Sequence, residues 1–67
     1  MERLELTVTG EAAGSRLDKG VALLAPALSR SQVQNLAEQE HILLNGRPAG
    51  KKDTLQEGDT VVITLPD

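Results

Sequence analysis

The sequence predicts an α+β fold, with two short packed helices against a small, mostly antiparallel sheet that includes a β-hairpin. Two stretches, one near each end of the chain, alternate apolar and polar residues, which is typical of half-buried strands. Between them lie two apolar stripes at helical spacing and Asn45-Gly46, the strongest two-residue hairpin signal. We therefore expect the order strand, helix, helix, hairpin, strand, in one domain spanning residues 1–67.

The first strand is predicted from Arg3 to Val8. Its apolar positions are Leu4, Leu6 and Val8, and each is preceded by a polar residue. A period of two places these side chains on one face of a strand. We expect the strand to end near Gly10.

The first helix is predicted after Ser15, which stands three residues before Asp18 at a spacing that can cap a helix. Pro26 limits how regular this helix can be near its end. Apolar residues follow at helical spacing, namely Leu17, Val21, Leu24 and Leu28.

The second helix is predicted to start at Ser29, because Ser29 and Gln32 have the spacing of a capping box. Val33, Leu36 and Ala37 form its apolar stripe. Only a few residues separate the two helices, so we expect them to pack as a pair.

A hairpin is predicted where the apolar run 42–44 meets Asn45-Gly46 and residues 47–49 return on the other side. Pro48 has no N–H to donate to a sheet, so its strand should lie at an edge.

The last strand is predicted from Thr60 to Leu65, after the turn pair Gly58-Asp59. Val61, Ile63 and Leu65 would share one face of this strand, with threonines and one valine on the other. This pattern favours a sheet that helices cover on one side only. The chain stops soon after this strand, and we expect it to be a piece of a longer protein.

Composition excludes several classes of protein. The chain has no cysteine and a single histidine, so it cannot form a disulfide framework or a thiolate zinc site. We expect no metal and no cofactor. No apolar run is long enough to cross a bilayer, and Met1-Glu2-Arg3 lacks the basic start of a signal peptide. We therefore expect a cytoplasmic protein without membrane contact.

Charge is segregated along the chain. The formal net charge is −3, yet the segment 14–52 carries an excess of cations and the two flanks an excess of acids. Local charge, rather than total charge, governs the attraction of a polyanion. The cations of the central segment are Arg16, Lys19, Arg30, Arg47, Lys51 and Lys52.

The start of the second helix is a candidate phosphate site. Unpaired N–H groups and a partial positive charge favour anions there, and Arg30 could pair with the same phosphate. Arg47, Lys51 and Lys52 could engage a neighbouring phosphate. The alternative is a solvated capping box, in which Ser29 and Gln32 satisfy backbone donors without any ligand.

Four pieces of sequence, in this order and spacing, resemble the alpha-L RNA-binding motif first named for small-subunit ribosomal protein S-four. They are Gly14-Ser15-Arg16-Leu17-Asp18, Leu28-Ser29-Arg30-Ser31-Gln32-Val33, Ile42-Leu43-Leu44-Asn45-Gly46 and Glu57-Gly58-Asp59-Thr60-Val61. With the preceding strand, the chain is most similar to the N-terminal domain of bacterial large-subunit ribosomal RNA pseudouridine synthases.

The resemblance implies a monomeric module that grips structured RNA, usually ribosomal, beside a catalytic domain of the same chain that isomerises uridine without a cofactor. The absence of aromatic residues favours the backbone and shape of folded RNA over stacked single strands. The contact residues implied by position are Arg16, Lys19, Ser29, Arg30, Ser31, Gln32, Arg47, Lys51 and Lys52.

Two features depart from the family pattern. Glu40 stands where the family often has a glycine, which commonly ends a helix in the left-handed conformation. We expect glutamate to require another termination geometry and to place a negative charge near His41 and the hairpin. The negative net charge suggests an auxiliary contact for a larger enzyme rather than an independent binder.

No residue of this chain is predicted to be catalytic. Arg16-Leu17-Asp18 matches the triplet around the catalytic aspartate of these synthases, but Ser15 replaces the preceding histidine and Lys19-Gly20-Val21 the following Thr-Ser-Gly run. We interpret Asp18 as a helix cap that pairs with Arg16 or Lys19.

Two other functions remain open. In the first, the helix that carries Val33 and Leu36 docks on a protein partner or on another part of the same chain, and RNA affinity is small. In the second, residues 57–65 resemble the tail of ubiquitin-like sulfur carriers. Those carriers need a C-terminal glycine pair, whereas this chain ends Leu65-Pro66-Asp67.

Overall fold

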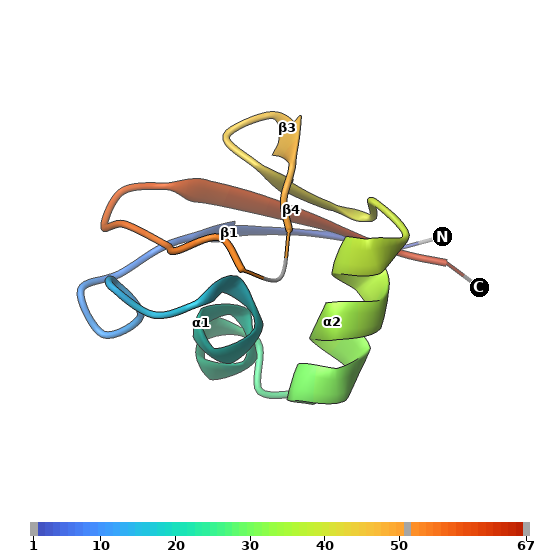
Figure 1. The fold of residues 1–67 in the computed structure, drawn as a ribbon, viewed down its shortest axis with the longest axis horizontal. Helices are drawn as coiled ribbons and strands as arrows, with labels where there is room; N and C mark the ends of the chain where they lie inside the picture. The colour runs from blue at the N-terminus through green and yellow to red at the C-terminus, as the bar shows by residue number, and fades with distance from the viewer. Residues whose placement is uncertain (1, 51, 67) are drawn as a thin grey trace.

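The computed structural model describes residues 2–50 and 52–66 and has the predicted α+β architecture (Figure 1). Both helices lie on the same side of one four-stranded sheet, whose strand order is β1-β4-β2-β3 with antiparallel neighbours throughout. The elements, in chain order, are β1 (Glu2–Thr7), α1 (Leu17–Leu24), α2 (Arg30–Glu38), β2 (Ile42–Leu44), β3 (Arg47–Pro48) and β4 (Thr60–Leu65).

The sheet is organised around β4, which pairs with β1 on one side and with β2 on the other. Ile63 stands opposite Leu4 in β1 and opposite Ile42 in β2, so three aliphatic residues cross the sheet in one row. β3 is the edge strand, as Pro48 predicts. The short exposed edge at β3 suits a proline, because no further strand must pair with it.

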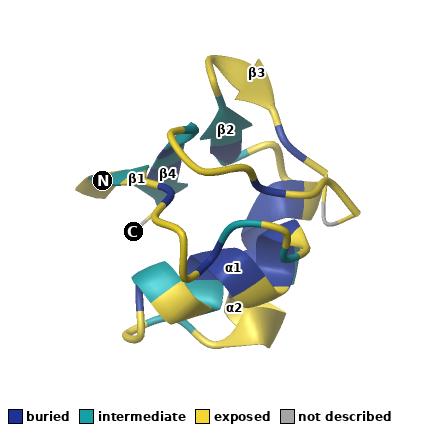
Figure 2. Cartoon of the chain, turned by 90° about the vertical axis from the view of Figure 1, so that its left-hand side faces the viewer, coloured by how far each residue is buried: buried dark blue, intermediate teal, exposed yellow. Residues whose placement is uncertain are grey.

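The core is entirely aliphatic and lies between the helices and the sheet (Figure 2). Among the predicted inward residues, Leu17, Val33 and Ile63 are fully shielded from solvent. Others are partly buried and pack against the core, namely Leu4, Leu6, Leu24, Leu28 and Leu65. Leu55, which sits between β3 and β4 in no regular element, is fully buried. A side chain from a connecting segment therefore completes the core under α1.

Gly20 allows Leu55 to enter the core. A Cβ placed on Gly20 would collide with Cδ1 of Leu55 and would also lie 3.4 Å from its Cγ. Glycine weakens a helix interior by about 1 kcal/mol relative to alanine, so its presence in the middle of α1 needs a packing reason. The close approach of Leu55 provides that reason.

The start of α1 differs from the prediction, because Ser15 and Asp18 form no capping box. Arg16 is the N-cap residue, and its side chain makes no capping bond. Instead, the Leu17 N–H donates to the Asp53 carbonyl at 2.7 Å, and the Leu55 N–H donates to the Ser15 carbonyl at 2.9 Å. The segment 53–55 thus satisfies the helix start that a serine side chain was expected to cap.

The end of α1 also differs from the predicted stripe. The helix ends at Leu24, and Leu28 lies in the connection to α2 rather than on the helix. Pro26 explains this, because it cannot donate a helical hydrogen bond and disfavours helical geometry in the residue before it.

Glu40 ends α2 in the left-handed conformation itself, with φ of 62°, so the expected different geometry is wrong. The His41 N–H donates to the Leu36 carbonyl at 2.9 Å, and the Glu40 N–H donates to the Ala37 carbonyl at 3.1 Å. These two bonds are those of a Schellman motif. The helix end keeps the geometry that favours glycine, although a glutamate occupies it.

The hairpin turn is hydrogen-bonded to the turn that precedes β4. Asn45 and Gly46 both have positive φ, at 53° and 86°, as a type I′ turn requires. The Asn45 side chain then donates to Asp59 Oδ1 at 3.1 Å and accepts from the Thr60 N–H at 3.0 Å. Asparagine therefore serves both as a turn residue and as a link between two turns.

Candidate functional site

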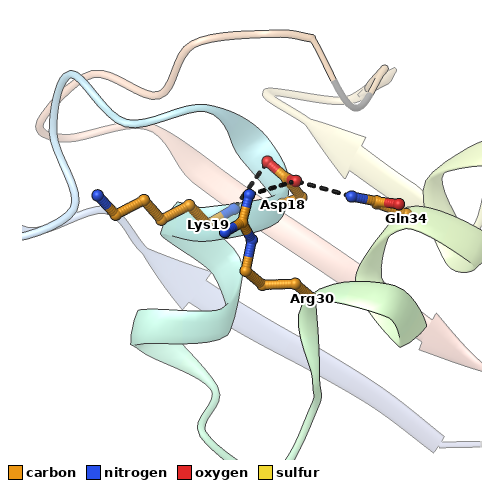
Figure 3. A network of polar contacts seen from close by, with 4 residues as sticks. All are labelled: Asp18, Lys19, Arg30 and Gln34. Atoms are coloured by element: carbon orange, nitrogen blue, oxygen red, sulfur yellow. Dashed lines mark hydrogen bonds and ion pairs between the residues drawn. The ribbon is translucent and has the colours of Figure 1, made fainter.

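Asp18 on α1 is the centre of a polar network that joins the two helices (Figure 3). Arg30 Nη2 donates to Asp18 Oδ2 at 3.1 Å, and Gln34 Nε2 donates to the same oxygen at 2.9 Å. The Lys19 N–H donates to Oδ1 at 2.9 Å. The Asp18 side chain is only 8% exposed, so its charge is held by protein donors rather than by water.

These contacts lower the pKa of Asp18 from 3.8 to about 2. The hydrogen bond from Gln34 contributes most to this lowering, and the Arg30 guanidinium and the Lys19 N–H add to it, while burial of the carboxyl acts in the opposite direction. Asp18 is therefore ionised at neutral pH. The helix pair is held by a charged carboxylate between two donors of α2.

The expected pairing of Asp18 with Arg16 or Lys19 is right only for the backbone of Lys19. Arg30 and Gln34 hold its carboxylate from twelve and sixteen residues away in sequence, whereas Arg16 forms no contact with it in the described part of the chain. Lys19 contributes its backbone N–H only, and its side chain extends away from the carboxylate (Figure 3). Arg30 and Gln34 are four residues apart, so they lie on the same face of α2.

The start of α2 has the predicted capping box. The Gln32 N–H donates to Ser29 Oγ at 3.1 Å, and the Ser29 N–H donates to Gln32 Oε1 at 2.8 Å. These two side chains are therefore engaged in capping. Arg30 and Ser31 occupy the first two helical positions, are exposed, and have N–H groups that no intrahelical carbonyl can satisfy.

The start of α1 lies beside the segment that follows the hairpin. Arg16 forms an isolated antiparallel bridge with Thr54. Arg47 and Asp53 line one shallow hollow of about 210 Å³, together with Leu44 and Pro48. The hairpin, the segment that contains Lys52 and the start of α1 are therefore neighbours.

The predicted contact residues are distributed over several parts of the structure. Arg16, Lys19, Arg30, Arg47 and Lys52 are all exposed, and we call these five residues the cationic surface. Gln32 lies on the other flank of α2, where it lines a groove with Leu65 and Pro66. Lys51 lies outside the described residues.

Gln34 is the site residue that sequence reasoning missed. It flanks the buried stripe of α2 at a half-buried position, one helical turn after Arg30. A spacing of four residues places Gln34 on the same helix face as Arg30, and this is the one signal in the sequence that relates the two.

In the described part of the chain, no three His, Asp or Glu side chains converge in a way that could hold a metal ion. The same residues include no helix with the length and apolar character needed to cross a membrane.

Comparison with known proteins places most of the chain in one family model. The model described as the S4 domain matches residues 15–61. The chain is 35% identical over 63 residues to ribosomal large subunit pseudouridine synthase D of Neisseria meningitidis, covering 94% of this chain and 17% of that protein. It is 46% identical over 55 residues to an uncharacterized RNA pseudouridine synthase of Mycobacterium tuberculosis, covering 82% and 18%.

A third relative is an uncharacterized RNA pseudouridine synthase of Bacillus subtilis. It is 30% identical over 67 residues, covering 100% of this chain and 22% of that protein. The chain thus spans about a fifth of the length of these curated relatives.

Proposed function

Since the chain belongs to the S4 domain family, we propose that it is an RNA-binding module that grips the phosphate backbone of structured RNA through its cationic surface. The observation that carries this proposal is the exposure of five cations around the starts of both helices and the hairpin, in a protein whose net charge is −3. Phosphate contacts supply most of the sequence-independent affinity for nucleic acids.

Arg30 is the centre of the proposed contact. Its side chain is 59% exposed, so the guanidinium reaches solvent even though Nη2 contacts Asp18. The backbone N–H groups of Arg30 and Ser31 lie at the positive end of α2. A phosphate at this position would accept from the guanidinium and from the helix start together.

The hairpin side of the surface would hold a second phosphate. Arg47 lines a hollow with Asp53, and the next residue, Thr54, forms the bridge with Arg16. Lys52, the exposed residue before Asp53, adds a third cation to this region. Because the chain contains no phenylalanine, tyrosine or tryptophan, it lacks the side chains on which single-strand binders commonly stack splayed bases. The partner is therefore folded RNA, read by its backbone and shape.

The relatives support a larger context for this module. Each is named a pseudouridine synthase, and this chain corresponds to about a fifth of its length. The module would be the N-terminal part of such an enzyme and would direct it to ribosomal RNA. Isomerisation of uridine would take place in a catalytic domain of the same chain and would need no cofactor. The enzyme would act in the cytoplasm. These 67 residues alone would catalyse nothing.

The proposal is tested by the affinity of the domain for a folded ribosomal RNA fragment and for an unstructured strand of equal length. We expect tighter binding to the folded RNA and a steep loss of affinity with added salt, because phosphate contacts release counterions. Equal affinity for both RNAs, or affinity that salt does not change, would contradict it.

One observation favours the docking alternative. A groove of about 270 Å³ runs between α2 and the end of β4, lined by leucines, a proline and uncharged amides. Val33, however, is fully buried in the core of this domain, so the apolar stripe of α2 is already covered. Docking would therefore use the groove, and its strength would not fall with salt.

A further inference from the structure

Asp18 places a buried anion next to the proposed phosphate contact. Its carboxylate lies 3.1 Å from the guanidinium of Arg30, and Asp18 is 5% exposed. A carboxylate repels phosphate, so its position beside the cation that would bind RNA requires a physical reason.

Arg30 contacts Asp18 through only one of its three guanidinium nitrogens. Only Nη2 of Arg30 donates to Asp18, and in the described part of the chain Nη1 and Nε make no hydrogen bond. A guanidinium carries five N–H donors in a planar fork. Nη2 is thus anchored, and the side chain as a whole stays 59% exposed, so the other donors remain available to a ligand.

The anchor itself is held rigidly. Gln34 donates to the same carboxylate oxygen as Arg30, and the Lys19 N–H donates to the other oxygen. Three donors from three residues fix the carboxylate in one orientation (Figure 3). The anchor is charged at neutral pH, far above the pKa of Asp18.

We propose that Asp18 is a positioning residue for RNA binding: it holds the guanidinium of Arg30 so that the free edge of the fork faces the phosphate before RNA arrives. This inference rests on the proposed function. An exposed arginine loses rotamer freedom when it binds, and a side chain that is already ordered loses less. The inference requires that this gain exceed the repulsion between the buried carboxylate and the phosphate.

The direction in which one substitution changes RNA affinity tests this inference. Asp18→Asn removes a negative charge, so electrostatics alone would raise RNA affinity. Loss of positioning would lower it instead, by about three- to tenfold, which lies in the lower part of the range of coupling within one side-chain network. Glu57→Gln is the matched control, because it removes one exposed carboxylate from the turn before β4. We expect unchanged or slightly higher affinity from that variant.

A double-mutant cycle shows whether Asp18 acts through Arg30. Arg30→Ala should weaken binding of a folded ribosomal RNA fragment, and Asp18→Asn should have no further effect in that background. An equal loss in both backgrounds would overturn the inference, because the effect would then be structural. Higher affinity of Asp18→Asn would overturn it too, even if Arg30→Ala weakens binding.

Failure of the proposed function gives a different pattern. If the unmodified domain does not bind folded RNA, or if Arg30→Ala leaves RNA affinity unchanged, the phosphate contact at Arg30 is absent. Asp18 would then have no RNA-binding group to position. Positioning alone fails when Arg30→Ala weakens binding and Asp18→Asn does not.

The side chain of Arg30 offers a direct readout in the free protein. The ¹⁵Nε–H relaxation of Arg30 should report an ordered side chain in the unmodified domain and a mobile one in Asp18→Asn. Equal mobility in both would overturn the inference. Gln34→Ala is a second variant that keeps every charge and loosens the carboxylate, so it serves if Asp18→Asn does not fold. It should lower RNA affinity and increase the mobility of Arg30, and no change in either would count against positioning.

Discussion

Arg30 on α2 forms an ion pair with Asp18 on the adjacent helix α1, with Nη2 of the arginine 3.1 Å from Oδ2 of the aspartate. The residue expected to contact RNA therefore also stabilises the fold. Each role can be measured separately, because one depends on RNA and the other on pH.

The first prediction concerns acid. The pKa of Asp18 is about 2 in the folded domain and near 3.8 in the unfolded chain, so between these values the unfolded chain binds more protons. Stability from Asp18 is therefore present above about pH 4 and is lost as the pH falls through about 2. Allowing for solvent screening, we expect a loss of about 1–2 kcal/mol. Urea unfolding near pH 6 and near pH 2 measures it.

Asp18→Asn is the reference for this experiment, because every other acid titrates in both proteins. The stability difference between the two proteins should shrink as the pH falls. A difference that stays constant with pH would mean that Asp18 has an ordinary pKa.

The second prediction concerns Gly20. Gly20→Ala should destabilise the domain by about 1–3 kcal/mol, because the new methyl group meets the buried Leu55 side chain. Helix propensity alone predicts the opposite sign, a gain of about 1 kcal/mol. Thermal unfolding decides between them, with Lys19→Ala as a control on the exposed side of the same helix. If Gly20→Ala proves stabilising, α1 and Leu55 do not approach as described.

The third prediction concerns Glu40. A residue with a Cβ costs about 1 kcal/mol in the left-handed conformation, so Glu40→Gly should stabilise the domain by up to about that amount. Glu40→Ala removes the same charge but keeps the Cβ, and we expect little gain from it. Chemical denaturation of the two variants compares them. Equal stabilisation by both would point to charge rather than backbone conformation.

The fourth prediction concerns the two faces of β4. Ile63 is fully buried, and its replacement by alanine should cost about 2–5 kcal/mol. Val62, its neighbour on the face without helices, is half-buried, and Val62→Ala should cost clearly less. Similar losses at both positions, measured by urea unfolding, would mean that the uncovered face of the sheet is packed against something else.

Local patterns in the sequence were sufficient to predict most of the fold. Alternation gave the faces of β1 and β4, and Asn45-Gly46 gave the turn between β2 and β3, because these signals depend on neighbouring residues alone. The capping box of Ser29 and Gln32 is local in the same sense. Each of these predictions is confirmed by the structure.

What escaped prediction depends on contacts between distant segments. The partners of Asp18 come from a second helix, and the start of α1 is satisfied by Asp53, which is 36 positions after Leu17. Leu55 lies in no periodic element, so no pattern marks it as core. Glu40 was misjudged because two backbone hydrogen bonds offset the cost of its conformation, and propensity does not include them.

The most direct test of the RNA-binding surface is amide NMR of the domain during titration with a folded ribosomal RNA fragment at two salt concentrations. The account predicts salt-sensitive shifts at the start of α2 and along the hairpin side, at Arg16, Arg30, Ser31 and Lys52 above all. The flank of α2 that faces Leu65 should change little. If these amides do not move even at low salt, or if only the groove beside Leu65 responds, the cationic surface does not bind RNA.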